Sequence, residues 1–567
     1  MLLRRFRFAL FAVSLCACAK QVTITVLATT DLHGNLLPYD YFTAHPAARG
    51  LAGIATHIAA ARAANPNNLL IDCGDTIQGS PLEYVWQYYV RGGHLPLYLH
   101  FDGAPLRGDP MMAAMNALHY DVMTLGNHEF NYGLKNLEAA RSQAHFPWLS
   151  ANTRVDAGAG TQPFAPYLIK EIAGVKIAII GITTPLIPLW ETPEHYRGLT
   201  FDDGVTAVRA ALADLRAKHH PDLVLVAAHS GLDRDLKTGA VRADDSRENM
   251  VYEIAGQVPG IDAIIFGHTH SQLADYRVNG VLLMQPKNWG GSLGRMDFTL
   301  DDSSGHWTVA SKSSRLIPLN ADTPVDPAIA AIAAPYHALA ERYLNTLVSE
   351  SPAALDAAYA RVEDTALLDA VQRVQLESAH ADVSFASSFN PRARIDKGPV
   401  TVRQIAALYV YDNQLYAIEG TGRMVREALE NAARYFLACP DESCTHGPLI
   451  NSQVVGYNYD VAAGVEYEID LTRPAGDRIR NLRFHGQPLK DDQKLRIAVN
   501  NYRAAGSAGY TMFRDAKIVW RSPEEIRDLL IRYYTEHKQF PASPDNNWRI
   551  VPEAAREELR RESQAAR

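Results

Sequence analysis

The sequence predicts an α/β protein with two domains, and three observations support that prediction. The chain has 567 residues, whereas a single hydrophobic core stops growing at roughly 250–300 residues. From residue 21 to about 325, apolar runs of strand length alternate with Ala-rich stretches. A stretch with apolar residues at helical spacing, 328–350, then leads into a second α/β part over about 352–552.

The composition is that of a soluble globular protein, with 47% hydrophobic and 21% charged residues. The net charge of -8 and the pI near 6.2 exclude a general nucleic-acid binder, because that class needs a basic face. A small nucleotide is still compatible with this charge, since metals and a few local groups can hold it. We therefore expect a monomer with a small-molecule partner and no nucleic-acid partner.

Residues 1–19 are predicted to be a signal peptide. Three arginines, at positions 4, 5 and 7, precede an apolar stretch, 8–16, that is too short to span a membrane. Two processing alternatives are open. Ala17-Cys18-Ala19 fits cleavage before Lys20, whereas residues 15–18 resemble a lipobox that would leave Cys18 as a lipid anchor. Both alternatives predict export.

The elements of the first part follow from apolar periodicity. We expect helices over 53–64 and 205–217, and near-continuous apolar strands covered on both faces of their sheets. The expected strands are 22–27, 68–71, 122–125, 175–180, 223–227 and 263–266. A linking helix is expected over 326–351, with Pro335 either kinking it or marking its start. The last fifteen residues, 553–567, read as a solvated helix or frayed tail.

Five short polar motifs each follow an apolar run of strand length. They are Asp31-Leu32-His33, Gly74-Asp75, Gly126-Asn127-His128-Glu129, His229 and Gly267-His268-Thr269-His270. If the strands share one sheet and one direction, the five loops converge at its carboxyl edge. In extended backbone, residues two apart point to the same side, so Asp31 would lie beside His33 and His268 beside His270. The glycines allow sharp turns and a close approach of the backbone.

These motifs supply carboxylates, an amide oxygen and imidazoles without a thiolate. That ligand set suits a pair of divalent cations and predicts metal-assisted hydrolysis. Asp75 is the best candidate for a bridging carboxylate. A lone histidine is more often structural, and an isolated Gly-Asp is usually a turn, but a complete ordered set after successive strands argues against chance.

The cysteines agree with export. Cys73 lies inside an apolar run and reads as a small buried hydrophobe. Cys439 and Cys444 flank a short polar loop. The sequence is compatible with a local disulfide there or with two unpaired thiols.

Together the motifs resemble the calcineurin-like metallophosphoesterase superfamily and, within it, the 5′-nucleotidase family of two-domain exported enzymes. The segment 125–134 is similar to the 2′,3′-cyclic-nucleotide 2′-phosphodiesterase/3′-nucleotidase branch, because Asn131 stands where the 5′-nucleotidase branch more often has Asp. The segments 409–413, 500–503 and 545–548 extend the likeness through the second domain.

The resemblance implies a four-layer α/β/β/α metallophosphoesterase domain over 20–325, a linking helix over 326–351, a C-terminal α/β nucleotide-binding domain over 352–552 and a charged tail over 553–567. It implies two divalent ions (Mn, Zn, Co or Fe). One would be held by Asp31, His33, Asp75 and His270, and the other by Asp75, Asn127, His229 and His268. His128 would face the scissile phosphate without binding metal. Tyr411 and Tyr502 would stack on the base, with Asn413 in the same pocket.

The expected function is therefore a periplasmic phosphoesterase that uses a metal-activated hydroxide. It would open 2′,3′-cyclic nucleotides to 3′-nucleotides and then release phosphate to give nucleosides. Two alternatives are kept, a 5′-nucleotidase or nucleotide-sugar hydrolase, and a non-catalytic surface binding protein with the same fold.

Overall fold

A computed structural model of the chain describes residues 20–90, 106–236, 239–240, 247–303, 305–439, 443–444 and 448–565. The predicted signal peptide, with Cys18, lies outside the described residues, as do 566–567. Among the described residues, none of the helices combines the length and apolar character needed to cross a bilayer.

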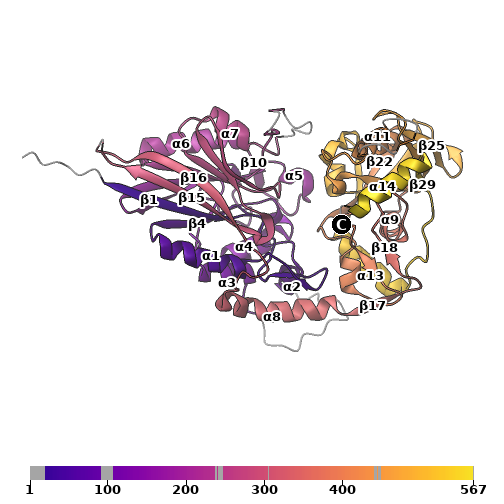
Figure 1. The fold of residues 1–567 in the computed structure, drawn as a ribbon, viewed down its shortest axis with the longest axis horizontal. Coiled ribbons are helices and arrows are strands. Elements are labelled where there is room, and N and C mark those ends of the chain that lie inside the picture. The colour runs from indigo at the N-terminus through magenta and orange to yellow at the C-terminus, as the bar shows by residue number, and fades with distance from the viewer. Residues whose placement is uncertain are drawn as a thin grey trace, which may run out of the picture.

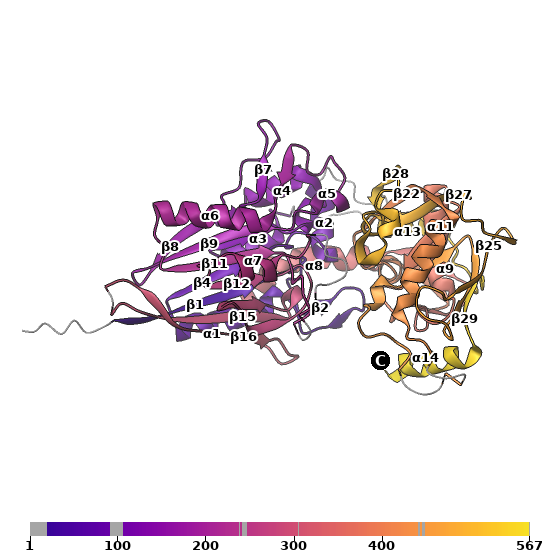
Figure 2. The same cartoon turned by 90° about the horizontal axis from the view of Figure 1, so that it is seen from above.

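The described chain forms two lobes that face one another, with helix α8 (Pro327–Leu344) running along one side from the first lobe to the second (Figures 1 and 2). The first lobe contains two six-stranded sheets, and the second contains a five-stranded and a four-stranded sheet. The predicted α/β class with two domains is confirmed.

Each sheet of the first lobe contains four neighbouring parallel strands. In the second sheet an antiparallel strand flanks them on each edge, whereas in the first sheet they reach one edge and two antiparallel strands complete the other. The order in the first sheet is β16 (Thr308–Pro318), β15 (Ser292–Asp301), β1 (Gln21–Thr29), β4 (Asn68–Asp72), β5 (Val122–Thr124) and β6 (Trp148–Leu149). The order in the second sheet is β13 (Leu273–Val278), β14 (Val281–Gln285), β12 (Ala263–Phe266), β11 (Leu223–His229), β9 (Val175–Thr183) and β8 (Tyr167–Ile172).

The two sheets pack face to face through side chains that alternate along the strands. Ile24 and Val26 of β1 pack in one fully buried cluster with Ile177 and Ile179 of β9 and Leu225 of β11. The outer face of the second sheet is covered by α6 (Gly204–Lys218) and α7 (Val251–Gln257). Helices α1 (Leu51–Ala64) and α3 (Pro110–Ala117) cover the first sheet, so that the layers run α/β/β/α (Figure 1).

The condition that the motif-bearing strands share one sheet is wrong. Strands β1, β4 and β5 belong to the first sheet, whereas β11 and β12 belong to the second. A near-continuous apolar run marks a strand as covered on both faces, but it does not distinguish a covering helix from a covering sheet. The carboxyl ends still meet, because the parallel strands of the stacked sheets run to the same edge of the lobe.

Helix α8 is shorter than predicted. Asp326 caps it by accepting from the amides of Ala328 and Ile329, and Pro327 occupies its first turn. Pro335 lies inside the helix, so its predicted role as the start is wrong. Residues Leu347–Ser351 form strand β17, which pairs with β21 (Gly398–Thr401) instead of continuing the helix.

The second lobe is built around the sheet ordered β23 (Asp460–Ala463), β19 (Val383–Ser387), β27 (Lys494–Asn500), β22 (Gln414–Thr421) and β28 (Ile518–Glu525). The smaller sheet is ordered β26 (Gln487–Pro488), β25 (Ile479–Phe484), β24 (Glu466–Asp470) and β29 (Trp548–Val551). Its helices are α9 (Ala366–Ala379), α10 (Val402–Ala406), α11 (Gly422–Ala432), α12 (Asn501–Ala504), α13 (Ile526–His537) and α14 (Glu553–Ala565).

Two predictions about the second lobe are resolved by its packing. Cys439 and Cys444 form a disulfide, which decides between the two alternatives. The charged C-terminal segment is a helix with a packed face, because Ala555 and Leu559 are fully buried and Glu562 accepts from the amide of Leu449 at 2.6 Å. A frayed tail is therefore wrong for residues 553–565.

Candidate metal centre and nucleoside pocket

The polar motifs meet where the strands of the two stacked sheets end. Asp31 and His33 follow β1, Asp75 follows β4, and Asn127 and His128 follow β5. From the other sheet, His229 is the last residue of β11, and His268 and His270 follow β12. All of these side chains are buried or half-buried.

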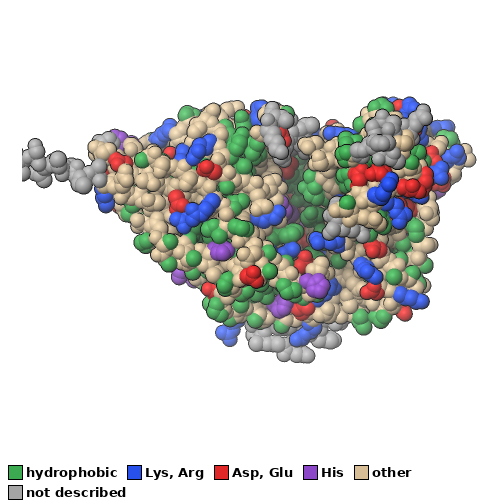
Figure 3. All heavy atoms as spheres, in the orientation of Figure 1, with side chains coloured by type: hydrophobic (Ala, Val, Ile, Leu, Met, Phe, Trp, Pro, Cys, Tyr) green, Lys and Arg blue, Asp and Glu red, His purple; other side chains and the backbone are tan. Residues whose placement is uncertain are grey.

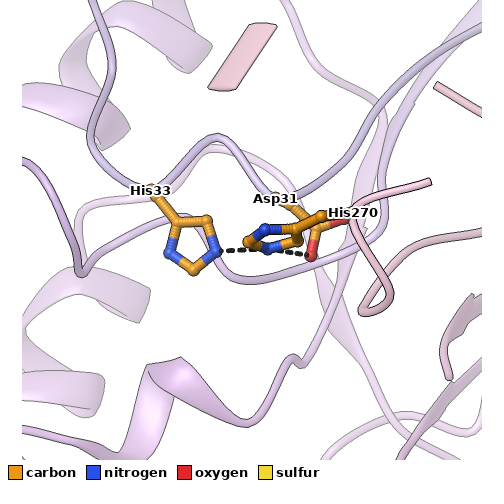
Figure 4. A group of neighbouring side chains, drawn as sticks. All are labelled: Asp31, His33 and His270. Atoms are coloured by element: carbon orange, nitrogen blue, oxygen red, sulfur yellow. Dashed lines mark hydrogen bonds and ion pairs between the residues drawn. The ribbon is translucent and has the colours of Figure 1, made fainter. Parts of the chain in front are cut away.

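Asp31, His33 and His270 form one group whose ligand atoms lie within 4.8 Å of one another. Figure 4 shows the His33 ring edge-on to His270, which lies between His33 and the Asp31 carboxylate. His33 Nε2 is 3.1 Å from His270 Nε2, and His270 Nε2 is 3.5 Å from Asp31 Oδ1. The three donors converge, as a divalent cation requires.

Asp75, His229 and His268 form a second group with the same compactness. His229 Nε2 is 2.9 Å from Asp75 Oδ2 and 3.1 Å from Asn127 Oδ1, and His268 Nδ1 is also 3.1 Å from Asn127 Oδ1. Asp75 Oδ2 lies 3.8 Å from His33 Nε2 of the first group. The Asp75 carboxylate therefore lies between the two groups, where a bridging ligand would be.

The outer hydrogen bonds of the histidines test whether these residues fit a cation. His229 Nδ1 is 2.7 Å from the carbonyl of Cys73, and His33 Nδ1 is 3.1 Å from the carbonyl of Gln78. A carbonyl only accepts, so each Nδ1 carries a proton and each Nε2 is turned to the centre. At His229, Nε2 faces two acceptor oxygens, so a positive charge is favoured there, either as a second proton on the ring or as a metal ion. The donor set fits divalent metal ions.

The charges of this buried centre shift its pKa values strongly. Burial lowers the pKa of His33 to about 3, which keeps this ring neutral. Burial also lowers the pKa of His229, but the charge and hydrogen bond of Asp75 outweigh it and raise the pKa to about 10. For Asp75, burial is outweighed by His229 and His128, which hold its pKa well below the usual range. The carboxylates thus attract positive charge strongly.

The backbone conformation of the ligands differs from the prediction. Asp31, His33, Asp75, His268 and His270 have φ of 50°, 46°, 57°, 74° and 51°, so they are in the left-handed region instead of extended backbone. Such residues cost of order 1–3 kcal/mol each and cluster at functional sites. Asp31 and His33 do lie in one group, as predicted, whereas His268 and His270 lie in different groups.

Two loops of the centre are held together by Glu129 and by close backbone packing. The buried Glu129 carboxylate accepts from the amides of Asp75 at 2.9 Å, Thr76 at 2.6 Å and Gly126 at 2.6 Å. A Cβ at Gly126 would lie less than 3.0 Å from the Asp75 carboxylate. Glycine at 126 is therefore required by close approach, as predicted.

His128 lies beside the two groups, within reach of the same space. Its amide donates to Asp75 Oδ1 at 2.8 Å, and its Nε2 is 3.9 Å from Asp75 Oδ2. Its Nδ1 is 2.5 Å from Asn131 Oδ1. The ring is thus held by its outer nitrogen while Nε2 faces the centre.

The second lobe brings Tyr502 to this edge. The Tyr502 ring stacks on Trp190 of the first lobe, with centroids 5.4 Å apart and planes at 22°, and its hydroxyl is 3.5 Å from Asn127 Nδ2. Tyr411 packs edge-on against Phe389 at 5.0 Å. Asn413 donates its side-chain amide to the hydroxyl of Tyr409 at 3.2 Å. Figure 3 shows the surface hollowed between the lobes, with hydrophobic side chains in the hollow.

Several residues that the sequence analysis did not single out contact the centre. Glu248 Oε1 is 2.7 Å from His268 Nε2, and the carbonyl of Gln78 orients His33. Trp190 lies between Tyr502 and His268, whose ring centroid is 5.8 Å away. Glu248 and Trp190 lie far from the end of a predicted strand, and Gln78 contacts His33 through its backbone carbonyl, so the signal that identified the candidate ligands does not apply to them.

A third group, Asp364, Asp369 and Asp545, lies in the second lobe. Burial and the neighbouring Asp364 carboxylate raise the pKa of Asp369. The group consists of carboxylates alone, without the mixed imidazole and amide ligands of the first two.

Comparisons with known proteins agree with this architecture. Residues 24–272 match the calcineurin-like phosphoesterase family, and residues 345–515 match the 5′-nucleotidase C-terminal domain family. A 2′,3′-cyclic-nucleotide 2′-phosphodiesterase/3′-nucleotidase of Yersinia enterocolitica is 31% identical over 94% of this chain and 89% of its own length.

A longer protein and a solved structure are also similar to this chain. The trifunctional nucleotide phosphoesterase protein YfkN of Bacillus subtilis is 30% identical over 94% of this chain, which spans 39% of that protein. A solved Staphylococcus aureus structure, assigned provisionally as a 5′-nucleotidase and in complex with α-ketoglutarate, is 27% identical with a TM-score of 0.79. It covers 93% of this chain and all of its own. The chain therefore belongs to the 5′-nucleotidase family of calcineurin-like phosphoesterases.

Proposed function

We propose that this protein hydrolyses 2′,3′-cyclic nucleotides to 3′-nucleotides and then 3′-nucleotides to nucleoside and phosphate. The similarity to the Yersinia enterocolitica enzyme over nearly the whole chain supports this choice of substrate. In this proposal the catalytic domain is 20–325, the linker is 326–351, the nucleoside-binding domain is 352–552 and the tail is 553–567. The protein is exported to the periplasm as a monomer.

One observation carries the proposal: Asp75 lies between two compact ligand groups, and the neighbouring Asn127 contacts Tyr502, an aromatic side chain from the other lobe. Asp31, His33, Asp75 and His270 would hold one divalent ion, and Asp75, Asn127, His229 and His268 the other. Ions in such a site activate water and neutralise phosphoryl charge. Manganese, zinc, cobalt and iron all suit these ligands.

The chain's own residues would position and protonate the substrate. His128 presents Nε2 to the centre, where it can donate a hydrogen bond or proton to the phosphoryl or leaving oxygen. Tyr411 and Tyr502 would stack on the base, an interaction worth about 1–3 kcal/mol that tolerates any base. Asn413 would act in the same pocket by fixing Tyr409 behind it.

The first test is a substrate panel of 2′,3′-cyclic AMP, 3′-AMP and 5′-AMP with manganese or zinc. We expect turnover of the cyclic and 3′ substrates. Turnover of 5′-AMP alone would refute this assignment in favour of a 5′-nucleotidase or nucleotide-sugar hydrolase, and turnover of none would favour a binding protein.

Two variants separate metal binding from chemistry. His128→Ala should keep its metal content but lower kcat by about 10²–10⁴-fold, the usual contribution of an acid–base group. Asp75→Asn should lose both metal and turnover, because the ligand shared by the two groups is gone. Metal analysis and steady-state kinetics on the same preparations check this, and an active Asp75→Asn variant would mean that the bridge is misassigned.

A further inference from the structure

A chain of four side chains runs outward from His128, away from the ligand groups. His128 Nδ1 is 2.5 Å from Asn131 Oδ1, and Asn131 Nδ2 donates to Glu191 Oε1. The other oxygen of Glu191, Oε2, is 2.8 Å from His195 Nδ1. Glu191 is only 7% exposed, so these contacts use both oxygens of a buried carboxylate.

The donor and acceptor roles along this chain follow from the carboxylate. The Asn131 amide nitrogen donates to a Glu191 oxygen, so the amide oxygen of Asn131 is turned to His128. An oxygen facing His128 Nδ1 in turn requires that Nδ1 carry the proton. Nε2 then faces the phosphate position, and it can donate there when the ring is the cation that carries a proton on both nitrogens.

The segment that carries Glu191 is held from both lobes. It follows directly on helix α5 (Ile187–Trp190), and its amide donates to the carbonyl of Ile187 at 3.0 Å. The preceding residue, Trp190, stacks on Tyr502 and accepts through its carbonyl from Asn501 Nδ2 at 2.6 Å. The second lobe therefore contacts Trp190 and holds the residue that precedes Glu191.

We propose that Glu191 is a positioning residue that holds the His128 ring in place, because it fixes the orientation of the Asn131 amide that accepts the Nδ1 proton of His128. This proposal rests on the proposed role of His128. Under this proposal, part of the turnover rate depends on Glu191, although its side chain reaches His128 only through Asn131.

Three variants test the donor–acceptor pattern. Glu191→Gln keeps the shape but can turn either end of its amide to Asn131, so we expect kcat to fall about 10-fold, the effect of about 1.4 kcal/mol. Asn131→Asp places two carboxylates together and should lower kcat further. The double variant Asn131→Asp with Glu191→Gln restores an acceptor for His128 and a donor for residue 131, so it should regain at least about 3-fold over Asn131→Asp.

KM and metal content should stay within about 2-fold of the wild type in every variant, because the substrate and metal contacts are intact. The matched control is Glu194→Gln in the same loop, whose side chain is 68% exposed and pairs with Arg197 at 3.8 Å. It should leave kcat unchanged.

An unchanged kcat in Glu191→Gln, or a double variant no better than Asn131→Asp, overturns the proposal. If Glu191→Gln does not fold, the kcat of Asn131→Asp compared with that of the double variant still tests the proposal. The assays use whichever nucleotide the wild type turns over, so an error in the substrate assignment does not affect them. A fully active His128→Ala variant would instead refute the proposed role of His128.

Discussion

At the residue scale, four imidazoles of the candidate metal centre divide their two ring nitrogens between the centre and an outer partner. Those partners are carbonyls for His33 and His229, a carboxylate for His268 and an amide oxygen for His128. Outer hydrogen bonds of this kind fix the tautomer and raise the basicity of a ligand.

Glu248 should therefore contribute to metal affinity without touching a metal. We expect Glu248→Gln to weaken metal binding about 10–100-fold, the usual effect of removing such a partner. Calorimetric titration of the metal-free protein with zinc or manganese measures this. Glu171→Gln on an exposed position of β8 is the control, and equal affinities for the two variants would contradict the role of Glu248.

The convergence of the candidate ligands was predictable from the sequence, whereas their outer partners were not. Asp31, Asp75 and His229 each end or follow an apolar strand, and the strand end fixes where they lie. Glu248 and Glu191 lie in connecting segments, where no periodicity gives a position. Their part in the centre depends on contacts across 20 and 60 residues, with His268 and Asn131.

At the scale of elements, the loops after β4 and β5 carry Asp75 and Asn127. The last residue of β4, Asp72, is a buried acid. Asp72 accepts from Thr29 Oγ1 at 2.6 Å, Gly74 N at 2.9 Å and Thr76 Oγ1 at 2.8 Å. Burial outweighs these hydrogen bonds and raises the pKa of Asp72 from 3.8 to about 7. The strand end is therefore sensitive to pH.

The sign of this effect follows from proton binding. Between pH 3.8 and about 7 the folded state holds a proton on Asp72 that the unfolded state has lost, so stability is full below pH 3.8 and falls as pH rises through 7. Asp72→Asn removes this loss. In EDTA, its free energy of unfolding relative to the wild type should increase by up to about 4 kcal/mol between pH 4 and pH 8.

Urea unfolding at both pH values measures this difference. Asp322→Asn on an exposed turn is the control and should change the free energy little at either pH. A constant difference between Asp72→Asn and the wild type across this range would contradict a protonated Asp72.

Strand and helix positions were also predictable, but their assembly into sheets was not. Helices α1 and α6 begin within two residues of the expected positions. The division of β1 and β11 between two sheets depends on which apolar face meets which, and Ile24 and Leu225 would read the same under a helix.

At the scale of the whole molecule, the lobes are joined by a buried polar contact as well as by α8. Asp412 of the second lobe accepts from Gln78 of the first and from Arg527 of α13, and both members of the ion pair are at most 4% exposed. Gln78 also orients His33. No local pattern could have predicted this contact, because it joins residues 334 positions apart.

Arg527→Met should leave the Asp412 carboxylate buried without its partner and cost about 3–5 kcal/mol of unfolding free energy. Arg532→Met on the same helix is the matched control, because the Arg532 side chain is 53% exposed and pairs with Glu524 at 3.3 Å. That exposed pair is worth under about 1 kcal/mol. If urea titrations showed similar losses of unfolding free energy for the two variants, the buried Arg527–Asp412 pair would not contribute the predicted stability.

The left-handed backbone at five of the ligands has a consequence for how this protein can change over generations. Glycine would remove the backbone strain at each of these positions but also the side chain that turnover needs. Selection for thermal stability and selection for turnover therefore favour different residues there. Laboratory evolution that rewards heat resistance alone should accumulate glycine or asparagine at positions 31, 33, 75, 268 and 270. Lineages that must also survive on nucleotides should retain the costly side chains.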